Sequence, residues 1–472
     1  MTQDTKNKLQ TGEMTVAERL SAFAADTDFG TLPEDVIYYS KRFIMDVVGC
    51  ILGGKTEKSS QIIAEVVRSW GGHPESTVIG YDFKTSCANA ALANGTIGHA
   101  LELDDDHRVG TQHPAVQTFP TVLAVGERVR ASGEECITAF AIGCESAIRI
   151  GMGFLGDLYY QGFHPTGVCG VFGSALAAGK LLKLNREQLT NALGIAGSQA
   201  SGLREWKTTG AWSKRLQAGH PNFGGVLSAL LAQGGFTGPR TVIDGTYGLM
   251  ESYSYQKHYS LIPIIDQLGI RYEMKDTSIK PHACCRFAQP IVDCTLALVF
   301  KYDLKPEDVA KVVVGTGKNT LKALTEPAER KYRPKTRPDA QFSLPYSVAV
   351  SIFKRRALEK EYNEECYTDP EILTLADKVT AYLDEEVESK WPEYYPAIVT
   401  IETVDGRKLT EKIDYPKGDP ENPVTDDELE YKFRNLASYT LKEDRINKLV
   451  DTLWNLEKVQ DIRELGALLS LE

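Results

Sequence analysis

The sequence predicts a mainly α protein, with a large all-helical domain and a smaller α+β lid domain inserted into it. Helical hydrophobic spacing fills the first half, β-type alternation appears only after about residue 270, and helical spacing returns at the C-terminus. The 472 residues are too many for one ordinary hydrophobic core. We therefore predict a helical domain over residues 1–274, a lid over 275–420, and C-terminal helices over 421–472 that rejoin the helical domain.

Capping signals mark the starts of several predicted helices. Thr15, Thr31, Asn185 and Thr425 each precede a Glu or Gln by three positions, which is the pattern of a capping box. The helix after Thr31 is expected to end at Gly53-Gly54. Residues 168–183 are rich in Gly and Ala, so the sequence also predicts a bundle with closely approaching helices.

The second unit is predicted from alternating β-branched residues around an Asp-Gly turn. The turn is Asp405-Gly406, and it predicts a hairpin. The expected elements are strands at Lys311–Val314, Ala397–Glu402 and Lys408–Ile413, and helices at Asp339–Phe353 and Asp369–Leu383.

Composition limits the function and the location. The net charge of −11 argues against a nucleic-acid partner, because phosphate binding needs a basic surface. Residues 1–14 are polar and are expected to be a frayed tail without a signal peptide, and no apolar run is long enough for a membrane helix. The nine cysteines form no C-x-x-C pair, which predicts reduced thiols, no cysteine-bound metal and a cytoplasmic protein.

An acidic run follows His99. Glu102, Asp104, Asp105 and Asp106 lie within five positions, and such charges repel unless solvent, cations or basic partners offset them. One interpretation is a solvated loop. Another is a magnesium site of the D-D-x-x-D type, although the last acidic position of that motif is taken by Arg108. We expect cations or solvent, and no metal ion, beside these acids.

His113 and His164 each precede a proline. Proline favours an extended conformation at His113 and His164, and each following proline is able to open a helix. Each imidazole would then lie at a helix N-terminus, where free N–H groups attract an anion such as a carboxylate. A neutral histidine there is suited to general base catalysis, and the alternative is a pair of ordinary capping histidines.

Several cations stand in apolar or glycine-rich segments. Lys214-Arg215 and the run from Lys280 through His282 to Arg286 have few other charges beside them, so burial against an anion is one interpretation and a solvated face is the other. Tyr346 is a candidate proton donor, and the alternative is a packing tyrosine with a satisfied hydroxyl.

Six segments together resemble one family, in one order along the chain. They are HALELDDDHRVGTQHPAVQTFPTVLAVGE, GFHPTGVCGVFGSALAAGKLL, ALGIAGSQASGL, SKRLQAGHPNFGGVLSALLAQGGFTGP, IKPHACCRFAQPIVD and FSLPYSVA. The chain from about Thr15 to Leu465 resembles the MmgE/PrpD family, which includes 2-methylcitrate dehydratase, cis-aconitate decarboxylase and iminodisuccinate epimerase.

The resemblance implies a helical domain with a lid, a homodimer, and an active site that needs no metal or organic cofactor. The implied catalytic positions are His113, His164, Lys214, Lys280 and Tyr346. The implied contacts to substrate come from the acidic run and the nearby cations, namely Glu102, Asp104, Asp105, Arg215, His282 and Arg286. The sequence departs from the family at Asp106, where a hydroxyl residue is usual, at His282, where an aromatic is common, and at Gln289, where a histidine is common.

These residues favour a lyase that acts on a small anionic polycarboxylate. The leading expectation is loss of water from a citrate-like hydroxy acid after proton abstraction next to a carboxylate, with cations to spread the charge that develops. Decarboxylation of a cis-aconitate-type acid and epimerisation of an iminodisuccinate-type acid are alternatives, since both pass through a similar carbanion. A non-catalytic dicarboxylate-binding protein is the alternative from another class.

Overall fold

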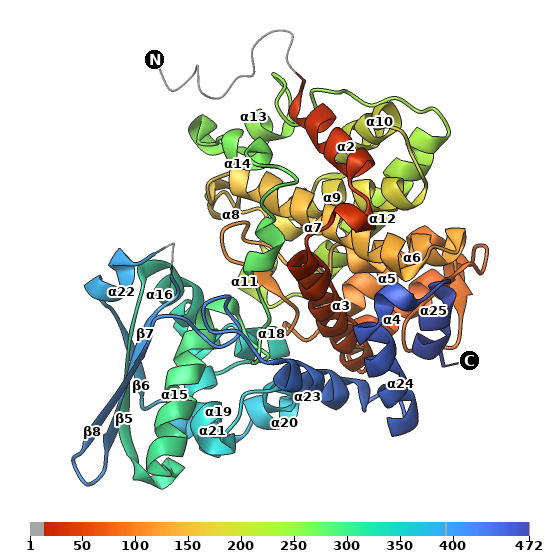
Figure 1. The fold of residues 1–472 in the computed structure, drawn as a ribbon. Coiled ribbons are helices and arrows are strands. Elements are labelled where there is room, and N and C mark those ends of the chain that lie inside the picture. Colours follow the sequence, from red (N-terminus) through yellow and green to blue (C-terminus); the bar gives the residue numbers. More distant parts are fainter. Residues whose placement is uncertain (1–13, 392–393, 472) are drawn as a thin grey trace.

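Figure 1 shows the computed structural model of the protein, which describes residues 14–391 and 394–471. Most of these residues are helical, which confirms the mainly α prediction. The polar stretch expected to be a frayed tail lies outside the described residues, apart from Met14.

The longer helices of the N-terminal part carry its core. They are α2 (Val16–Asp26), α3 (Glu34–Gly54), α4 (Lys58–Trp70), α5 (Cys87–Gly98), α6 (Phe119–Val129), α7 (Gly133–Gly153), α9 (Pro165–Leu181), α10 (Arg186–Ala196) and α12 (Ser213–Gln233). Short helices join them, namely α8 (Asp157–Tyr160), α11 (Trp206–Thr209), α13 (Leu249–Tyr253) and α14 (Ile262–Ile265). Two small antiparallel pairs also occur here, β1 (Ser76–Thr77) with β2 (Lys84–Thr85), and β3 (Asp106–His107) with β4 (Thr277–Ser278).

Glycines allow the central helices to touch. A Cβ atom on Gly225 of α12 would collide with Ser174 of α9, and one on Gly219 would collide with Thr96 of α5. The Gly- and Ala-rich segment forms α9, so the expected close packing is confirmed. By length and composition α7 is the one helix of the described chain able to cross a membrane, but 94% of its apolar window is buried inside the protein, as in a core helix.

The next part of the chain is an α+β unit around a four-stranded sheet. The strands run in the order β6-β5-β7-β8, and only the β5–β6 pair is parallel. α15 packs on β7 and β8 (Figure 1). The strands are β5 (Val309–Thr316), β6 (Val379–Leu383), β7 (Ala397–Thr403) and β8 (Lys408–Ile413). The helices are α15 (Gln289–Tyr302), α16 (Lys318–Thr325), α17 (Ala328–Lys331), α18 (Arg337–Gln341), α19 (Leu344–Lys354), α20 (Glu364–Tyr367), α21 (Pro370–Ala376) and α22 (Glu385–Ser389).

The hairpin at Asp405-Gly406 is confirmed, and two predicted helices need correction. The segment Asp339–Phe353 is divided between α18 and α19. Phe342 is the C-cap of the first helix, and Ser343 caps the second by accepting the N–H of Tyr346. The segment Asp369–Leu383 is helical only to Ala376. Its remainder is β6, in which Val379 is buried and the backbone pairs with β5.

Two separate hydrophobic cores lie in the structure. The first combines side chains from Val16 to Ile279 with side chains from Val424 to Leu469, and the second is built mainly from Ala283 to Leu409. The C-terminal helices α23 (Asp426–Ala437), α24 (Glu443–Trp454) and α25 (Arg463–Leu469) pack on α3 and α6, as Figure 1 shows for α23 and α24 beside α3. The action of the α+β unit as a lid, and the proposed domain boundaries, stay predictions.

The capping boxes predicted at Thr15, Asn185 and Thr425 are confirmed. The one at Thr31 is wrong. The Thr31 hydroxyl is used in a preceding turn, where it donates to the carbonyl of Asp28, and Pro33 occupies the N-cap of α3. The same helix ends at Gly54, as expected.

Candidate active site

A short antiparallel strand pair brings the acidic run and Lys280 together. The run leaves the end of α5 and enters β3, whose Asp106 lies opposite Ser278 of β4. Lys280 follows two residues later. Next to both segments, the partly buried Lys432 of α23 donates to the carbonyls of Leu103 and Lys280. The C-terminal helix therefore fixes the acidic run against the start of the α+β unit.

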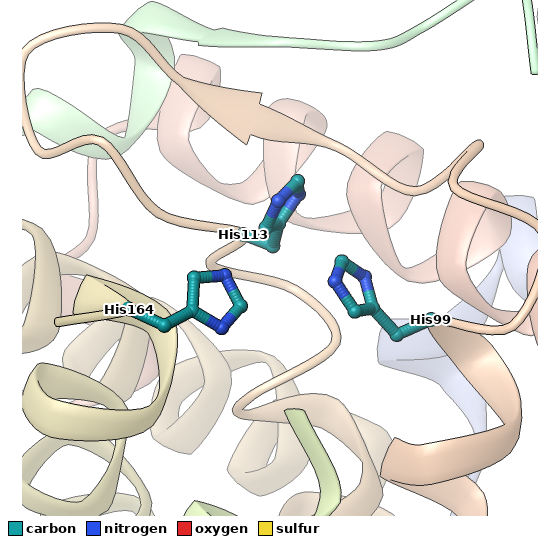
Figure 2. Close-up of side chains that lie close together, drawn as sticks. All are labelled: His99, His113 and His164. Atoms are coloured by element: carbon teal, nitrogen blue, oxygen red, sulfur yellow. The ribbon is translucent and has the colours of Figure 1, made fainter. Parts of the chain in front are cut away.

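Three imidazoles face one another (Figure 2). His99 is the C-cap of α5, His113 follows β3, and His164 is the N-cap of α9. The ring centroids of His99 and His113 are 4.5 Å apart, and those of His113 and His164 are 6.0 Å apart. Pro165 opens α9, as the sequence predicts. Pro114 instead begins a turn, in which the N–H of Ala115 donates to the Asp105 carboxylate at 2.9 Å, and α6 starts only at Phe119.

An oxygen atom faces Nδ1 of each imidazole. The partners are the Asp104 carboxylate for His99 at 2.7 Å, the Asp105 carbonyl for His113 at 2.6 Å, and the Gln217 amide for His164 at 3.1 Å. An oxygen acceptor selects the tautomer with the proton on Nδ1, which leaves the lone pair on Nε2. Nε2 of His99 is buried and has no hydrogen-bond partner.

Burial and nearby cations keep two of these histidines neutral. Loss of solvent and the Lys280 ammonium hold the pKa of His113 well below its usual range. Loss of solvent and the Lys214 ammonium do the same to the pKa of His164. At neutral pH both rings are therefore bases with a free Nε2.

Glu102 is the anion that joins the two lysines. Its carboxylate accepts the Lys214 ammonium directly and lies 3.6 Å from the Lys280 ammonium. Burial alone would raise the pKa of Glu102, but Lys214 and Lys280 lower it well below its usual range, so Glu102 is ionised. Its φ angle of 57° is in the left-handed region, which is uncommon for a residue other than glycine.

The three aspartates have different partners. Asp104 contacts His99 and lies 3.4 Å from Nδ1 of His113. Burial and the neighbouring Asp104 raise the pKa of Asp105 well above its usual range. Burial raises the pKa of Asp106 to about 6, although Lys280 and Arg286 lower it in part. Asp106 is therefore a carboxyl group that can carry a proton near neutral pH, 3.9 Å from Nε2 of His113.

These groups line a cavity of about 60 Å³, the catalytic cavity. The lining combines polar and charged side chains with aromatic rings, and Lys214 lies over the rings of Trp206 and Phe342. The lining residues are Glu102, Asp106, Thr111, His113, Tyr159, His164, Trp206, Lys214, Cys285, Arg286, Phe287, Phe342 and Tyr395. Lys280 lies immediately behind Glu102.

Other predicted site residues have partners outside this cavity. Tyr346 is fully buried in the second core, and its hydroxyl donates to the carbonyl of Glu361 at 2.5 Å. Arg215 binds Ser59 and Glu57. Neither Tyr346 nor Arg215 therefore lines the catalytic cavity.

His282 and Gln289 also have partners outside the catalytic cavity. His282 lies 2.8 Å from Asp293, and the Gln289 amide donates to the carbonyl of His282. Asp105 likewise lies behind the cavity. Its carbonyl accepts from Nδ1 of His113, and its carboxylate accepts the N–H of Ala115.

The three imidazoles are the group of described residues that offers a metal-binding arrangement. One ligand nitrogen from each lies within 4.8 Å of the other two. Zinc–nitrogen bonds of about 2.0–2.1 Å would require these nitrogens to move closer together. The ammonium groups of Lys214 and Lys280 act against a cation there, since both lower the pKa of His113.

The sequence prediction missed His99 and the aromatic residues that line the cavity. His99 has no following proline, and only its place at the end of α5 turns it toward Asp104. The aromatic side chains come from five distant segments, so no local pattern marks them.

Comparisons with known proteins match nearly the whole chain. Residues 18–262 match the MmgE/PrpD N-terminal domain, and residues 282–456 match the MmgE/PrpD C-terminal domain. The chain belongs to the MmgE/PrpD family. It is 29% identical to a cis-aconitate decarboxylase of Aspergillus terreus, over 96% of both chains. It is 28% identical to the human cis-aconitate decarboxylase over 93% of this chain and 91% of that protein, and 26% identical to the mouse one over 93% and 90%.

Proposed function

We propose that the protein is a cofactor-independent lyase for a small polycarboxylate, and that its reaction is decarboxylation of a cis-aconitate-like acid. The observation that carries the proposal is the convergence of Lys214 and Arg286 on one cavity, with Lys280 immediately behind its Glu102. The same cavity holds neutral histidines and a protonatable Asp106. The names of the relatives support decarboxylation.

The cations suit a substrate with two or three carboxylates. In the free protein Lys214 and Lys280 share the charge of Glu102, so bound carboxylates would enter a site whose cations are already desolvated and oriented. Arg286 is held by Asp419 and lies 3.7 Å from Asp106, which fixes its direction at the cavity wall.

The reaction breaks the bond between carbon and one carboxylate and releases carbon dioxide. The electron pair left behind spreads into the neighbouring carboxylate-substituted double bond, where the ammonium groups stabilise the charge. One proton must then be added to carbon. Asp106, with a pKa of about 6, is suited to deliver it. The free Nε2 of His113, 3.9 Å away, can take up a proton from solvent and return it to Asp106 after small movement.

Dehydration of a citrate-like acid is the second candidate. It requires an acid beside the departing hydroxyl, and the hydroxyl of Tyr346 is used in the second core. Asp106 would have to serve as that acid, with His113 or His164 as the base. This extra demand makes decarboxylation the preferred reaction.

A substrate screen in deuterated water tests the proposal. The purified protein is incubated separately with cis-aconitate, citrate, 2-methylcitrate and iminodisuccinate, with and without EDTA, and followed by NMR. We expect loss of carbon dioxide from cis-aconitate, one deuterium in the product, and no effect of EDTA. Water loss from a citrate would assign a dehydratase, and racemisation of iminodisuccinate would assign an epimerase. Binding without turnover would assign a dicarboxylate-binding protein.

A further inference from the structure

A second hollow continues from the catalytic cavity, and we call it the antechamber. Its volume is about 380 Å³, against about 60 Å³ for the catalytic cavity. Thr111, Tyr159, Phe287 and Tyr395 line both spaces, so they are adjoining parts of one hollow. The remaining residues of the antechamber are Arg108, Val109, Met152, Leu155, Gly156, Tyr160 and Trp391.

The lining of the antechamber is apolar and aromatic. Phe287, Trp391 and Tyr395 form a cluster in which the ring centroids are 4.7 to 5.7 Å apart. At the rim, Val109 is 53% exposed and Leu155 is 48% exposed. Exposed apolar side chains next to an apolar hollow favour an apolar ligand, because the ligand would remove them from water.

The one charged residue of this lining is already paired. The Arg108 guanidinium binds Glu421 at 2.8 Å and lies 3.5 Å from Asp419. The antechamber therefore offers one cation, which two carboxylates already share, whereas the catalytic cavity offers two, Lys214 and Arg286. Charge and apolar surface are divided between the two spaces.

We propose that the antechamber binds an apolar substituent of the substrate, so that the preferred substrate is a polycarboxylate that carries an alkyl or aryl group. This inference rests on the proposed function, because it needs the carboxylates to lie in the catalytic cavity. The substituent would pass between Tyr159 and the ring cluster into the antechamber. Each methylene buried there improves affinity by about fourfold.

Calorimetric titration of unreactive ligands tests the inference without turnover. The ligands are succinate, 2-propylsuccinate and 2-hexylsuccinate, titrated into the full chain. We expect the propyl compound to bind about 60-fold more tightly than succinate when its three carbons are buried, and the hexyl compound more tightly still. Equal affinities for all three ligands would overturn the antechamber but leave the polycarboxylate site intact. Failure of every ligand to bind would overturn both.

A double variant, Val109→Asn with Leu155→Asn, makes the rim polar. Leu155 has a φ angle of 52°, and Asn tolerates this left-handed conformation better than most residues, so the fold should persist. We expect succinate affinity within twofold of native and at least a fivefold loss of the gain from the hexyl group. Ile270→Asn is the matched control, because it changes an exposed apolar residue outside the antechamber and should change neither value.

Light scattering on the same proteins tests the competing occupant, a second copy of this chain. If the double variant loses a dimer while the hexyl gain stays native, the antechamber is a subunit interface and the inference is wrong. An unchanged oligomeric state with a reduced hexyl gain supports it.

Discussion

Replacing Lys280 by methionine tests whether the buried cations hold the substrate. The Lys280 side chain is fully buried, its ammonium donates to the carbonyl of Glu102 at 3.3 Å, and it lies 3.6 Å from that residue's carboxylate. Burial would lower the pKa of Lys280, but the carboxylates of Glu102, Asp104 and Asp106 raise it, so the group is charged at every working pH. Methionine keeps most of the stem and removes only the charge.

The expected loss of activity follows from the charged contacts that the variant loses. Truncating one partner of a buried charged pair costs about 2–5 kcal/mol, much of it from the partner left unpaired. In the free variant Glu102 keeps Lys214 as a partner, so the lower part of this range applies. We expect kcat/KM to fall about 100-fold, or about 2.7 kcal/mol. Both terms should change, with higher KM from lost carboxylate binding and lower kcat from lost stabilisation of the carbanion.

Initial rates of carbon dioxide release from cis-aconitate supply the assay, and thermal unfolding confirms that the variant is folded. Lys318→Ala is the matched control, because Lys318 is an exposed lysine at the start of α16 in the same α+β unit. The control should keep native kinetics. Native kcat and KM in folded Lys280→Met would refute the role of this cation in binding and catalysis.

Three further outcomes follow from the site. Because Asp106 has a pKa of about 6, it is protonated below that pH and ionised above it, so kcat/KM should fall about tenfold per pH unit above pH 6. Asp106→Asn should lose this pH dependence together with most activity, and the same slope in the variant would assign it to another group. The lowered pKa values of His113 and His164 predict no loss of activity near pH 6.5 on acidification. His→Gln at the residue that handles the proton should lower kcat by about 10²–10⁴-fold and stop deuterium incorporation, whereas the other variant should retain some incorporation. If both variants incorporate deuterium at the native rate, neither histidine is involved. Tyr346→Phe should keep kcat within twofold and lose about 1–2 kcal/mol of stability in urea unfolding, because the carbonyl of Glu361 loses its donor. A hundredfold loss of kcat in this variant would return Tyr346 to the catalytic site.

The sequence predicted what depends on local patterns. Capping boxes at Thr15 and Asn185 are satisfied within three residues, so their outcome does not depend on the rest of the fold. The Asp405-Gly406 turn likewise determines the hairpin by itself. The error at β6 has the opposite cause. Its alternation is short, and it becomes a strand because β5 offers a parallel edge from a segment almost 70 residues earlier.

A site residue could be predicted where its type and charge determine its partner. It could not be predicted where the direction of the side chain in the fold determines the partner. Glu102, Lys214 and Arg286 meet at the cavity because charged groups in apolar segments must find partners. Arg215, next to Lys214 in the chain, points instead to Glu57, since adjacent positions on a helix face different directions. The sequence around Tyr346 does not distinguish a catalytic tyrosine from a packing one. Its hydrogen bond to the carbonyl of Glu361 shows that it packs in the core.

The acidic run acquires its function from unequal surroundings. Four acids of one type in five positions would have similar pKa values in water and would repel one another. In the folded chain Glu102 is paired with two ammonium groups and stays ionised, while burial lets Asp106 keep a proton to about pH 6. Groups of one chemical type whose pKa values are driven apart can take separate roles as anion and acid. In the proposed reaction the run would supply both an anchor for the lysines and a proton donor, with no need for a second acid such as Tyr346.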